Sequence, residues 1–329
     1  MTDEKKVLVE DIVPEPTKTN DHKGIIEITL DDGVKVKAVG LVYGVEHTIR
    51  GEGFTANLFL DHYNQRIRVS YYEGANIGEM IEKVRYIAEA NNYDKIIFKA
   101  SQTDWQHFLP HGYVLEAVIK FFHHGKSAYV MSKFRSQERL TSQSLMSEIL
   151  LIENLMSVPS KLGNRTLADG YECRLARRED VPAMAKLYSE IFQSYPSPLS
   201  HEAYLETVFQ KNNIFSVIYH GNELVSAASA ELNPTAKAAE LTDCATLKEH
   251  RGRGLMTVIL ERLEQELMER KYICGFTMAR ARSFGMNQVF YNMGYVFMGR
   301  LINNCDIYGA YEDMNIWVRD LRKKEPPKS

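Results

Sequence analysis

The chain has 329 residues, of which 44% are hydrophobic and 25% charged, as in globular proteins that bury full-sized cores. Its 40 basic and 43 acidic residues give a formal net charge of −3, which argues against the concentrated basic face that nucleic-acid binding requires. No apolar run reaches the ~18 residues of a membrane span, and the amino terminus lacks the apolar core of a signal peptide. We therefore expect a cytoplasmic protein without nucleic-acid or membrane partners, and two domains at about 100–200 residues each.

The first part of the chain predicts an α+β domain over residues 23–139. It is preceded by a polar, proline-containing stretch, 1–22, which is typical of a flexible leader. Alternating apolar residues indicate strands, and Asp31-Asp32-Gly33 is a hairpin-turn signal. Strands are predicted over 25–30, 34–41, 55–60, 66–72 and 95–100, and a helix over 77–91.

A helical linker over residues 140–170 is predicted next, with its helix at 145–156. A second domain then covers 171–321, and a basic tail covers 322–329. The pattern within this domain mixes alternating and helical periods, so an α/β fold is expected. Its predicted strands are 173–175, 214–219, 223–231, one that begins near Glu240, and 272–279, and its predicted helices are 181–191, 202–210 and 257–270.

The two halves of the chain resemble each other. Gly112-Tyr113-Val114 and Gly294-Tyr295-Val296 each follow a helix, a strand and a short amphipathic segment. Met131–Phe134 and Met314–Trp317 then end an apolar run at comparable offsets. We interpret this pattern as a degenerate repeat of one α/β unit, with chance similarity between two mixed α/β halves as the alternative.

The four cysteines, all in the second half, predict reduced thiols. They form no C-x-x-C pair and have no histidine at zinc spacing, so no metal site is expected. The four are Cys173, Cys244, Cys274 and Cys305.

The most informative segment is the loop Arg251-Gly252-Arg253-Gly254, which lies between a strand and an amphipathic helix. Glycines let a backbone approach a ligand closely, and the free amides and dipole at a helix start suit a pyrophosphate. The two arginines add positive charge at the same place. The loop is not a Walker loop, and the third glycine of a dinucleotide fingerprint is absent.

In this context the loop closely resembles the coenzyme A motif of GNAT acyltransferases, Gln/Arg-x-x-Gly-x-Gly/Ala. Residues 249–254 match at both glycines and depart from the motif at Glu249; an ordinary glycine-rich turn is the alternative. The resemblance covers most of 171–320. It implies a GNAT acyl-CoA N-acyltransferase fold in the C-terminal half, preceded by a degenerate GNAT-like α+β domain. It also implies acetyl-CoA as co-substrate, bound by Ala245, Thr246, Leu247, Arg251, Gly252, Arg253, Gly254 and Leu255.

Glu240 is the candidate general base, because some GNAT enzymes carry a glutamate with this role on the corresponding strand. A primary amine with a pKa of ~10 must lose a proton before it can attack a thioester. The alternative is a solvated glutamate at a strand edge. Strict alternation along the strand would place Asp243 on the opposite face, so the two carboxylates are not expected to share a role.

The family often places a general-acid tyrosine four residues before the closing glycine, and this chain departs from that pattern. Phe290 occupies the position, and the tyrosine stands one residue later at Tyr291. One residue corresponds to a rotation of ~100° around a helix, so Tyr291 does not simply replace it. Tyr291 is the candidate acid, with water or another hydroxyl as the alternative.

Several phrases resemble one GNAT branch, the β-lysine N-acetyltransferases. They include Phe192–Pro196, Glu240–Asp243 and Ala279–Asn287. The implied reaction acetylates the side-chain amine of β-lysine to give Nε-acetyl-β-lysine, a compatible solute. The residue types that such a substrate needs are present at Tyr195, at Arg282 and Asn304 for the carboxylate, and at Glu312 for the second ammonium.

Two alternatives to this function remain open. One keeps the fold and changes the acceptor to another small diamine, another amino acid or a protein lysine. The other is a non-catalytic acyl-CoA sensor, which Phe290 favours and the retained Glu240 and glycines disfavour. The first domain lacks an Arg-Gly-x-Gly loop and is expected to contribute packing or one wall of the pocket. Homodimerisation is left open.

Overall fold

The computed structural model describes residues 23–41, 43–161, 166–192, 195–211, 213–307 and 309–322. The predicted leader and most of the predicted basic tail lie outside these residues. The fold is mixed α/β, as predicted, and all the predicted helices and strands are present with shifts of a few residues at their ends. The strands that were not predicted are β3 (Val45–Gly51), β7 (Val114–His123) and β8 (Lys126–Phe134) in the first half, and β14 (Val296–Ile307) and β15 (Ala310–Asp320) in the second.

The first half begins with a hairpin whose two strands pair antiparallel around the predicted Asp31–Gly33 turn. The helix α1 packs against the strands that follow and buries Ile81, Val84 and Ile87. The elements of this half are β1 (Lys23–Thr29), β2 (Lys35–Leu41), β3, β4 (Phe54–Asp61), β5 (Arg66–Gly74), α1 (Ile77–Ala90), β6 (Lys95–Ala100), α2 (Trp105–Phe108), η1 (Leu109–His111), β7 (Val114–His123) and β8 (Lys126–Phe134).

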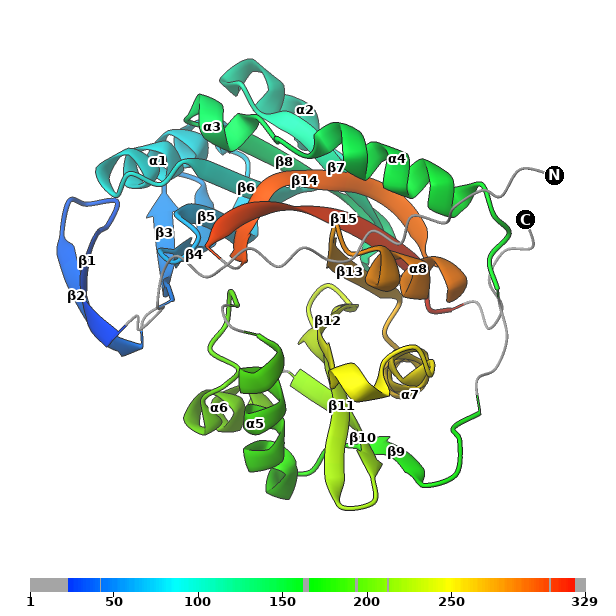
Figure 1. The fold of residues 1–329 in the computed structure, drawn as a ribbon. Coiled ribbons are helices and arrows are strands. Elements are labelled where there is room, and N and C mark those ends of the chain that lie inside the picture. Colours follow the sequence, from blue (N-terminus) through cyan, green and yellow to red (C-terminus); the bar gives the residue numbers. More distant parts are fainter. Residues whose placement is uncertain are drawn as a thin grey trace.

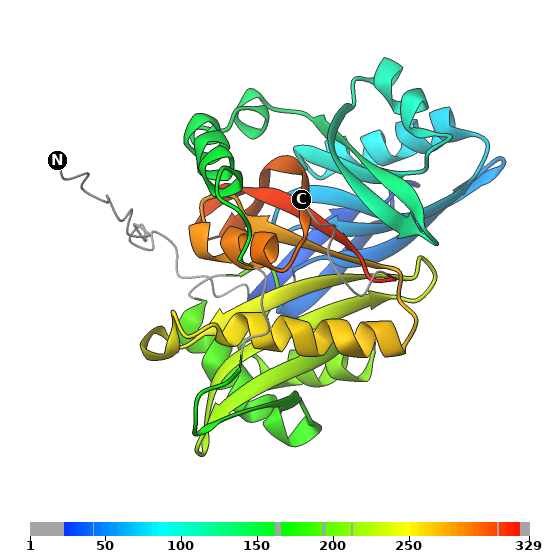
Figure 2. The ribbon, with the colours of Figure 1, turned by 90° about the vertical axis from the view of Figure 1, so that its right-hand side faces the viewer.

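Two helices then lead into the second half, and the longer of them packs on α8 (Figure 2). The connecting helices are α3 (Gln137–Leu140) and α4 (Leu145–Met156). The second half comprises β9 (Tyr171–Leu175), η2 (Arg178–Asp180), α5 (Val181–Ile191), α6 (Glu202–Gln210), β10 (Asn213–His220), β11 (Glu223–Asn233), β12 (Ala238–Thr246), η3 (Lys248–His250), α7 (Leu255–Glu269), β13 (Cys274–Arg280), α8 (Phe284–Asn292), β14 (Val296–Ile307) and β15 (Ala310–Asp320).

All strands after the first hairpin join one 13-stranded sheet in the order β3-β4-β5-β6-β8-β7-β14-β15-β13-β12-β11-β10-β9. The order β4-β5-β6-β8-β7 in the first half repeats as β11-β12-β13-β15-β14 in the second. Each run contains one parallel pair, and a helix connects the two strands of that pair. The strand order therefore shows the repeat that the sequence indicated, whereas the exact domain bounds stay a prediction.

The two halves meet where β7 and β14 pair through Ala117 and Gly299. Gly299 has a φ of 132°, and a Cβ there would lie 2.4 Å from the carbonyl oxygen of Glu116, so only glycine fits. Buried charges fasten β14 to the first half. Arg66 donates to the carbonyl of Asn304 at 2.7 Å, and Lys95 donates to that of Ile302 at 2.8 Å. The two halves therefore pack as one body.

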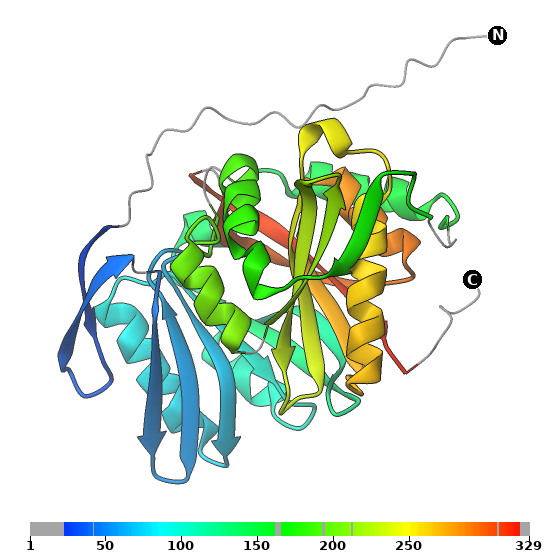
Figure 3. The same cartoon turned by 90° about the horizontal axis from the view of Figure 1, so that it is seen from below.

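The middle of the sheet, around β14 and β15, arches over the other elements of the second half, as Figure 1 shows. Beneath the arch of β7, β8, β14 and β15 lie α5, α6 and strands β9 to β12. Seen from below in Figure 3, β10 to β12 have α5 and α6 on one side and α7 on the other. A separate core of apolar side chains from both halves, including Phe122, Phe276 and Leu301, fills the junction.

Candidate active site

A cavity of about 2620 Å³ lies between the two halves. Its upper wall comes from strands β3 to β8 and β13 to β15, and its lower wall comes from the loop after α5 and from β11, β12 and the start of α7. Candidate residues that are distant in sequence therefore face one space.

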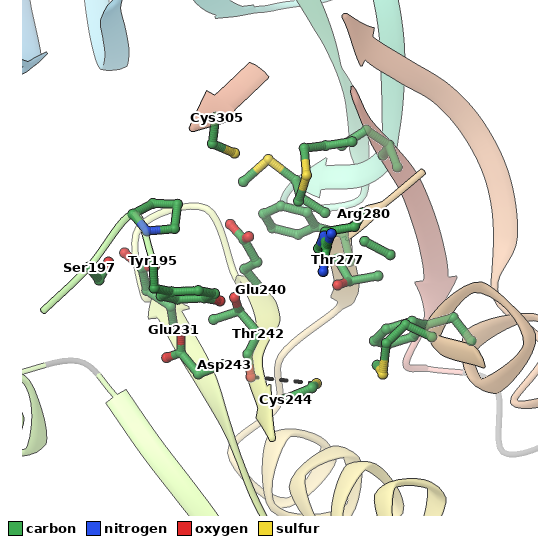
Figure 4. Close-up of a pocket in the computed structure, with 18 of the residues that line it drawn as sticks. Tyr195, Ser197, Glu231, Glu240, Thr242, Asp243, Cys244, Thr277, Arg280 and Cys305 are labelled. Atoms are coloured by element: carbon green, nitrogen blue, oxygen red, sulfur yellow. Dashed lines mark hydrogen bonds between the residues drawn. The ribbon is translucent and has the colours of Figure 1, made fainter. Parts of the chain in front are cut away.

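Glu240 lies where β12 and β13 separate. The two strands pair in parallel only from Ala238 to Glu240, so the rest of β12 has no hydrogen-bonded neighbour on that side among the described strands. The carboxylate of Glu240 points into the cavity (Figure 4). Directly across the strand pair from it stands Glu231 of β11. This splayed edge offers free backbone groups to a ligand next to a carboxylate.

Asp243 joins these two residues in what we call the acidic cluster, Glu231, Glu240 and Asp243. The expectation that Asp243 faces away from Glu240 is wrong, because both line the same cavity. The pairing of β11 with β12 shifts register between Ala227 and Ser229, and Asp243 adopts a φ of 55°. Such a bulge interrupts the alternation of side chains along the strand.

The surroundings of Glu240 and Asp243 favour the protonated carboxyl. Burial raises the pKa of Glu240 to about 7, and the negative charges of Glu231 and Asp243 add to the effect. Burial likewise raises the pKa of Asp243 to about 6, although Ser229 donates a hydrogen bond to its carboxylate at 2.6 Å. Glu240 thus exchanges its proton near neutral pH, as a general base should.

Tyr195 covers the acidic cluster from the loop after α5. Its ring stacks on Phe192 with centroids 4.3 Å apart, and Phe192 stacks on Tyr188 of α5 at 5.9 Å. Figure 4 shows Tyr195 beside Glu231 and Glu240. Burial raises the pKa of the Tyr195 hydroxyl, so it stays neutral and can donate or accept a hydrogen bond in the cavity.

The start of α7 forms a second part of the cavity wall. Gly252 and Gly254 have φ values of 74° and 75°, which only glycine adopts at little cost, and Gly254 is the residue directly before the helix. Arg251 donates to the carbonyl of Thr246 at 3.1 Å and so links the loop to the splayed edge of β12. A glycine-rich loop at the start of a helix suits phosphate groups through its backbone amides and the helix dipole.

The comparisons with known proteins agree with this geometry. The Acetyltransferase (GNAT) family profile matches residues 181–292. The chain is 38% identical over 279 residues to N-acetyltransferase YodP of Bacillus subtilis (strain 168), covering 83% of this chain and 99% of that protein. This chain belongs to the GNAT family. It is an acetyl-CoA-dependent N-acetyltransferase.

A second relative, from Methanosarcina mazei (strain ATCC BAA-159 / DSM 3647 / Goe1 / Go1 / JCM 11833 / OCM 88), is named Beta-lysine N(6)-acetyltransferase. It is 35% identical over 230 residues, covering 64% of this chain and 85% of that protein. Among solved structures, an N-acetyltransferase from Staphylococcus aureus Mu50 aligns with a TM-score of 0.41 and 18% identity, covering 46% of this chain and 98% of that one.

The predicted coenzyme A residues divide into two groups. Those that line the cavity are Thr246, Arg251, Gly252, Gly254 and Leu255. Ala245, Leu247 and Arg253 are not among the lining residues. Ala245 is buried and its carbonyl accepts a hydrogen bond from Ser226 at 3.0 Å, whereas Arg253 is exposed. In a GNAT enzyme, backbone pairing with the pantetheine arm does not require side chains in the cavity, so the two buried residues remain candidates.

The first half offers no equivalent loop at the start of α1. The Asn76 side chain accepts a hydrogen bond from the backbone amide of Glu79 at 3.3 Å and donates to the Glu79 carboxylate at 2.8 Å. The amide is therefore capped and a negative charge stands beside it, which disfavours a phosphate.

The four predicted substrate residues all line the cavity. Glu312 already has a partner, because Arg280 donates two hydrogen bonds to its carboxylate at 2.7 and 2.6 Å. Asn304 is buried, and its side-chain oxygen has no hydrogen-bond partner among the described residues. Arg282 is exposed at the rim. Tyr195 is the one that lies against the acidic cluster.

Tyr291 does not lie where a general acid is needed. Phe290, one residue earlier, lines the cavity, whereas Tyr291 is not among the lining residues. The Tyr291 hydroxyl donates to the carbonyl of Val158 at 2.9 Å, on the side of α8 that faces the linker. The helical rotation between neighbouring residues explains the difference. We therefore correct the assignment of Tyr291, and water or another hydroxyl remains the alternative that the sequence offered.

Tyr291→Phe is expected to leave kcat within about threefold of the wild-type value, far from the ~10²–10⁴-fold cost of losing a general acid. The variant should lose about 0.5–1.5 kcal/mol of stability with its hydrogen bond to Val158. Steady-state kinetics and thermal unfolding test both effects. A 100-fold fall in kcat with an unchanged Tm would restore the catalytic role.

The described residues contain neither a metal-binding cluster nor a membrane-spanning helix. None of their His, Cys, Asp and Glu side chains form a group of three or more that could hold a metal ion. Their four cysteines are free thiols. No helix among them is long and apolar enough to cross a membrane.

Proposed function

We propose that this GNAT enzyme acetylates the side-chain amine of β-lysine and gives Nε-acetyl-β-lysine, a compatible solute. The acidic cluster carries the proposal, because three carboxylates around Tyr195 attract a substrate with two ammonium groups. The similarity to the Methanosarcina mazei protein named Beta-lysine N(6)-acetyltransferase supports the choice of amine. The Bacillus subtilis relative is named only as an N-acetyltransferase and is neutral on this point.

Glu240 acts as the general base in this proposal. Acetyl-CoA supplies the acetyl group as a thioester. The side-chain ammonium of the substrate enters beside Glu240 and transfers a proton to its carboxylate, directly or through one water. The free amine then attacks the thioester carbonyl, the C–S bond breaks, and coenzyme A leaves as a thiolate that takes a proton from water. A pKa of about 7 lets Glu240 accept that proton and release it to solvent near neutral pH. Glu231 and Asp243 strengthen the base by keeping negative charge near it.

The start of α7 positions the acetyl donor. The backbone amides at Gly252 and Gly254 bind the pyrophosphate, and the Arg251 guanidinium adds positive charge beside it. The splayed edge of β12 beyond Glu240 leads from this loop to the acidic cluster. A donor that follows that edge is directed toward the base, which is how the proposal brings thioester and amine together.

The amine is tested with a panel of acceptors. The protein is incubated with acetyl-CoA and with β-lysine, α-lysine, ornithine, putrescine or a lysine-containing peptide, and thiol release is followed. β-Lysine is expected to exceed α-lysine in kcat/KM by roughly ten- to hundredfold, because a misplaced ammonium leaves buried polar groups unsatisfied. Mass spectrometry locates the acetyl group. Equal kcat/KM for the two lysines would show that only the reacting amine is recognised.

A further inference from the structure

Lys99 brings an unpaired positive charge into the cavity from the first half of the chain. It stands on β6 and lines the cavity, and it is only partly exposed. Its ammonium lies 5.0 Å from the ring centroid of Phe122 and 5.4 Å from that of Phe276. Among the described residues, no hydrogen bond or ion pair joins this ammonium to another side chain.

The surroundings of Lys99 call for an anion. Burial lowers the pKa of Lys99, and the distant charges of Glu240 and Glu231 counteract only part of this effect. Aromatic faces attract a cation but do not accept its hydrogen bonds. By contrast, the other buried lysine of the same strand, Lys95, has a carboxylate partner in Glu116 at 2.8 Å. The ammonium of Lys99 therefore has capacity for a partner that the chain does not supply.

Arg68 extends the positive charge on the same wall. It lies on β5, next to β6, and lines the cavity. Its guanidinium sits 4.8 Å from the centroid of Phe59, and its Nε is 3.8 Å from Asp61, too far for a hydrogen bond. Both Arg68 and Lys99 lower the pKa of Glu240, so they act on the acidic cluster from across the cavity.

We propose that Lys99, assisted by Arg68, binds the carboxylate of a free amino-acid substrate whose side-chain ammonium lies at the acidic cluster. The inference rests on the proposed function and adds how the substrate is oriented. A diamino acid carries positive and negative charge at its two ends, and the cavity carries the opposite charge on two walls. The first half of the chain then determines that the acceptor is an amino acid and not a simple diamine.

This assignment replaces Arg282 and Asn304 as the carboxylate site. Arg282 is exposed at the rim, where water weakens an ion pair. Asn304 offers only a neutral amide, although its side-chain oxygen lacks a partner. A charged, desolvated donor such as Lys99 forms a stronger bond with a carboxylate than either of them.

The test compares β-lysine with its carboxamide, in which a neutral amide replaces the carboxylate, in wild type, Lys99→Met and Lys99→Arg. Methionine keeps an unbranched apolar stem between the two rings and removes the charge. Wild type is expected to prefer β-lysine. Lys99→Met should lower kcat/KM for β-lysine by about 10- to 100-fold more than kcat/KM for the carboxamide. Lys99→Arg should retain much of the preference.

The ratio of kcat/KM for β-lysine to kcat/KM for its carboxamide separates recognition of the carboxylate from effects on the base Glu240. Lys99→Met also removes a charge that lowers the pKa of Glu240, but this change affects both substrates equally. Lys126→Met, on an exposed lysine at the start of β8 outside the cavity lining, is the matched control. Lys99→Gln is a second neutral variant if the methionine variant does not fold.

The outcomes distinguish the two proposals. An undiminished preference for β-lysine in the neutral Lys99 variants would overturn the carboxylate assignment and leave the proposed function standing. A wild-type enzyme that acetylates putrescine or a peptide but neither β-lysine nor its carboxamide would overturn the proposed function. A collapse of the ratio in Lys99→Met, but not in Lys126→Met, supports both.

Discussion

Glu240→Gln is expected to lower kcat by roughly 10²–10⁴-fold at pH 7, which is the usual cost of removing a general base. Glutamine is nearly isosteric with glutamate but cannot accept the ammonium proton. At pH 7 only a small fraction of an amine with a pKa of ~10 is unprotonated, so turnover depends on the carboxylate. Steady-state kinetics from pH 6 to 10 measure the effect.

The ionisation of Glu240 determines the direction in which kcat/KM changes with pH. Glu240 must be ionised to act, so wild-type kcat/KM should rise as the pH increases through about 7. The glutamine variant should lack this rise and recover much of its rate at high pH, where the free amine is already present. Normal turnover of Glu240→Gln at pH 7 would assign the proton transfer to water or to another group.

Glu231→Gln is the informative comparison. Glu231 raises the pKa of Glu240 by charge repulsion, so its neutralisation should move the rise in kcat/KM to lower pH without abolishing turnover. Neither substitution should unfold the enzyme. The pKa of Glu240 is higher in the folded protein than in the unfolded chain. Ionisation of Glu240 therefore lowers the free energy of unfolding as the pH rises above the unfolded pKa, and this loss reaches its full size above the folded pKa. Glu240→Gln removes this cost, so its Tm at pH 8 should not fall.

Local patterns were sufficient to predict most of the elements. Strand β6 was predicted with the same ends that it has, because it is a short apolar run. The same is true of α5, whose apolar residues recur at helical spacing and bury one face. The glycines before α7 also have a local signature, because a strand, a glycine-rich loop and a helix follow one another in the chain. Local sequence patterns therefore identify both the elements and the position of the glycine-rich loop before α7, whose role in phosphate binding stays a prediction.

The parts of the site that depend on long-range packing could not be predicted. Asp243 faces the cavity because of a bulge in β12, and no residue type near that position predicts a bulge. Lys99 becomes a cavity residue only when β7 and β14 join the two halves. Glu231 is the exception. The turn that begins at Pro234 joins β11 directly to β12, and this hairpin places Glu231 opposite Glu240. The sequence could therefore have predicted this pair.

Gly254→Val is expected to abolish measurable acetyl-CoA binding while the fold survives. Gly254 has a φ of 75°, and a β-branched residue at this φ is strained, so the backbone before α7 must move. Movement of the amides removes the phosphate site, and the new side chain fills the approach to it. Isothermal titration calorimetry with acetyl-CoA measures the loss, and circular dichroism follows the fold.

Gly221→Val separates the lost binding site from backbone strain alone. Gly221 lies in the turn between β10 and β11 with a φ of 61°, and a Cβ there would meet no atom within 4 Å. It is not among the residues that line the cavity. Valine at either position strains a left-handed glycine, so both variants should lose stability to a similar extent. Only Gly254→Val should lose its affinity for acetyl-CoA. If both variants bound acetyl-CoA as tightly as wild type, the amides before α7 would not hold the donor.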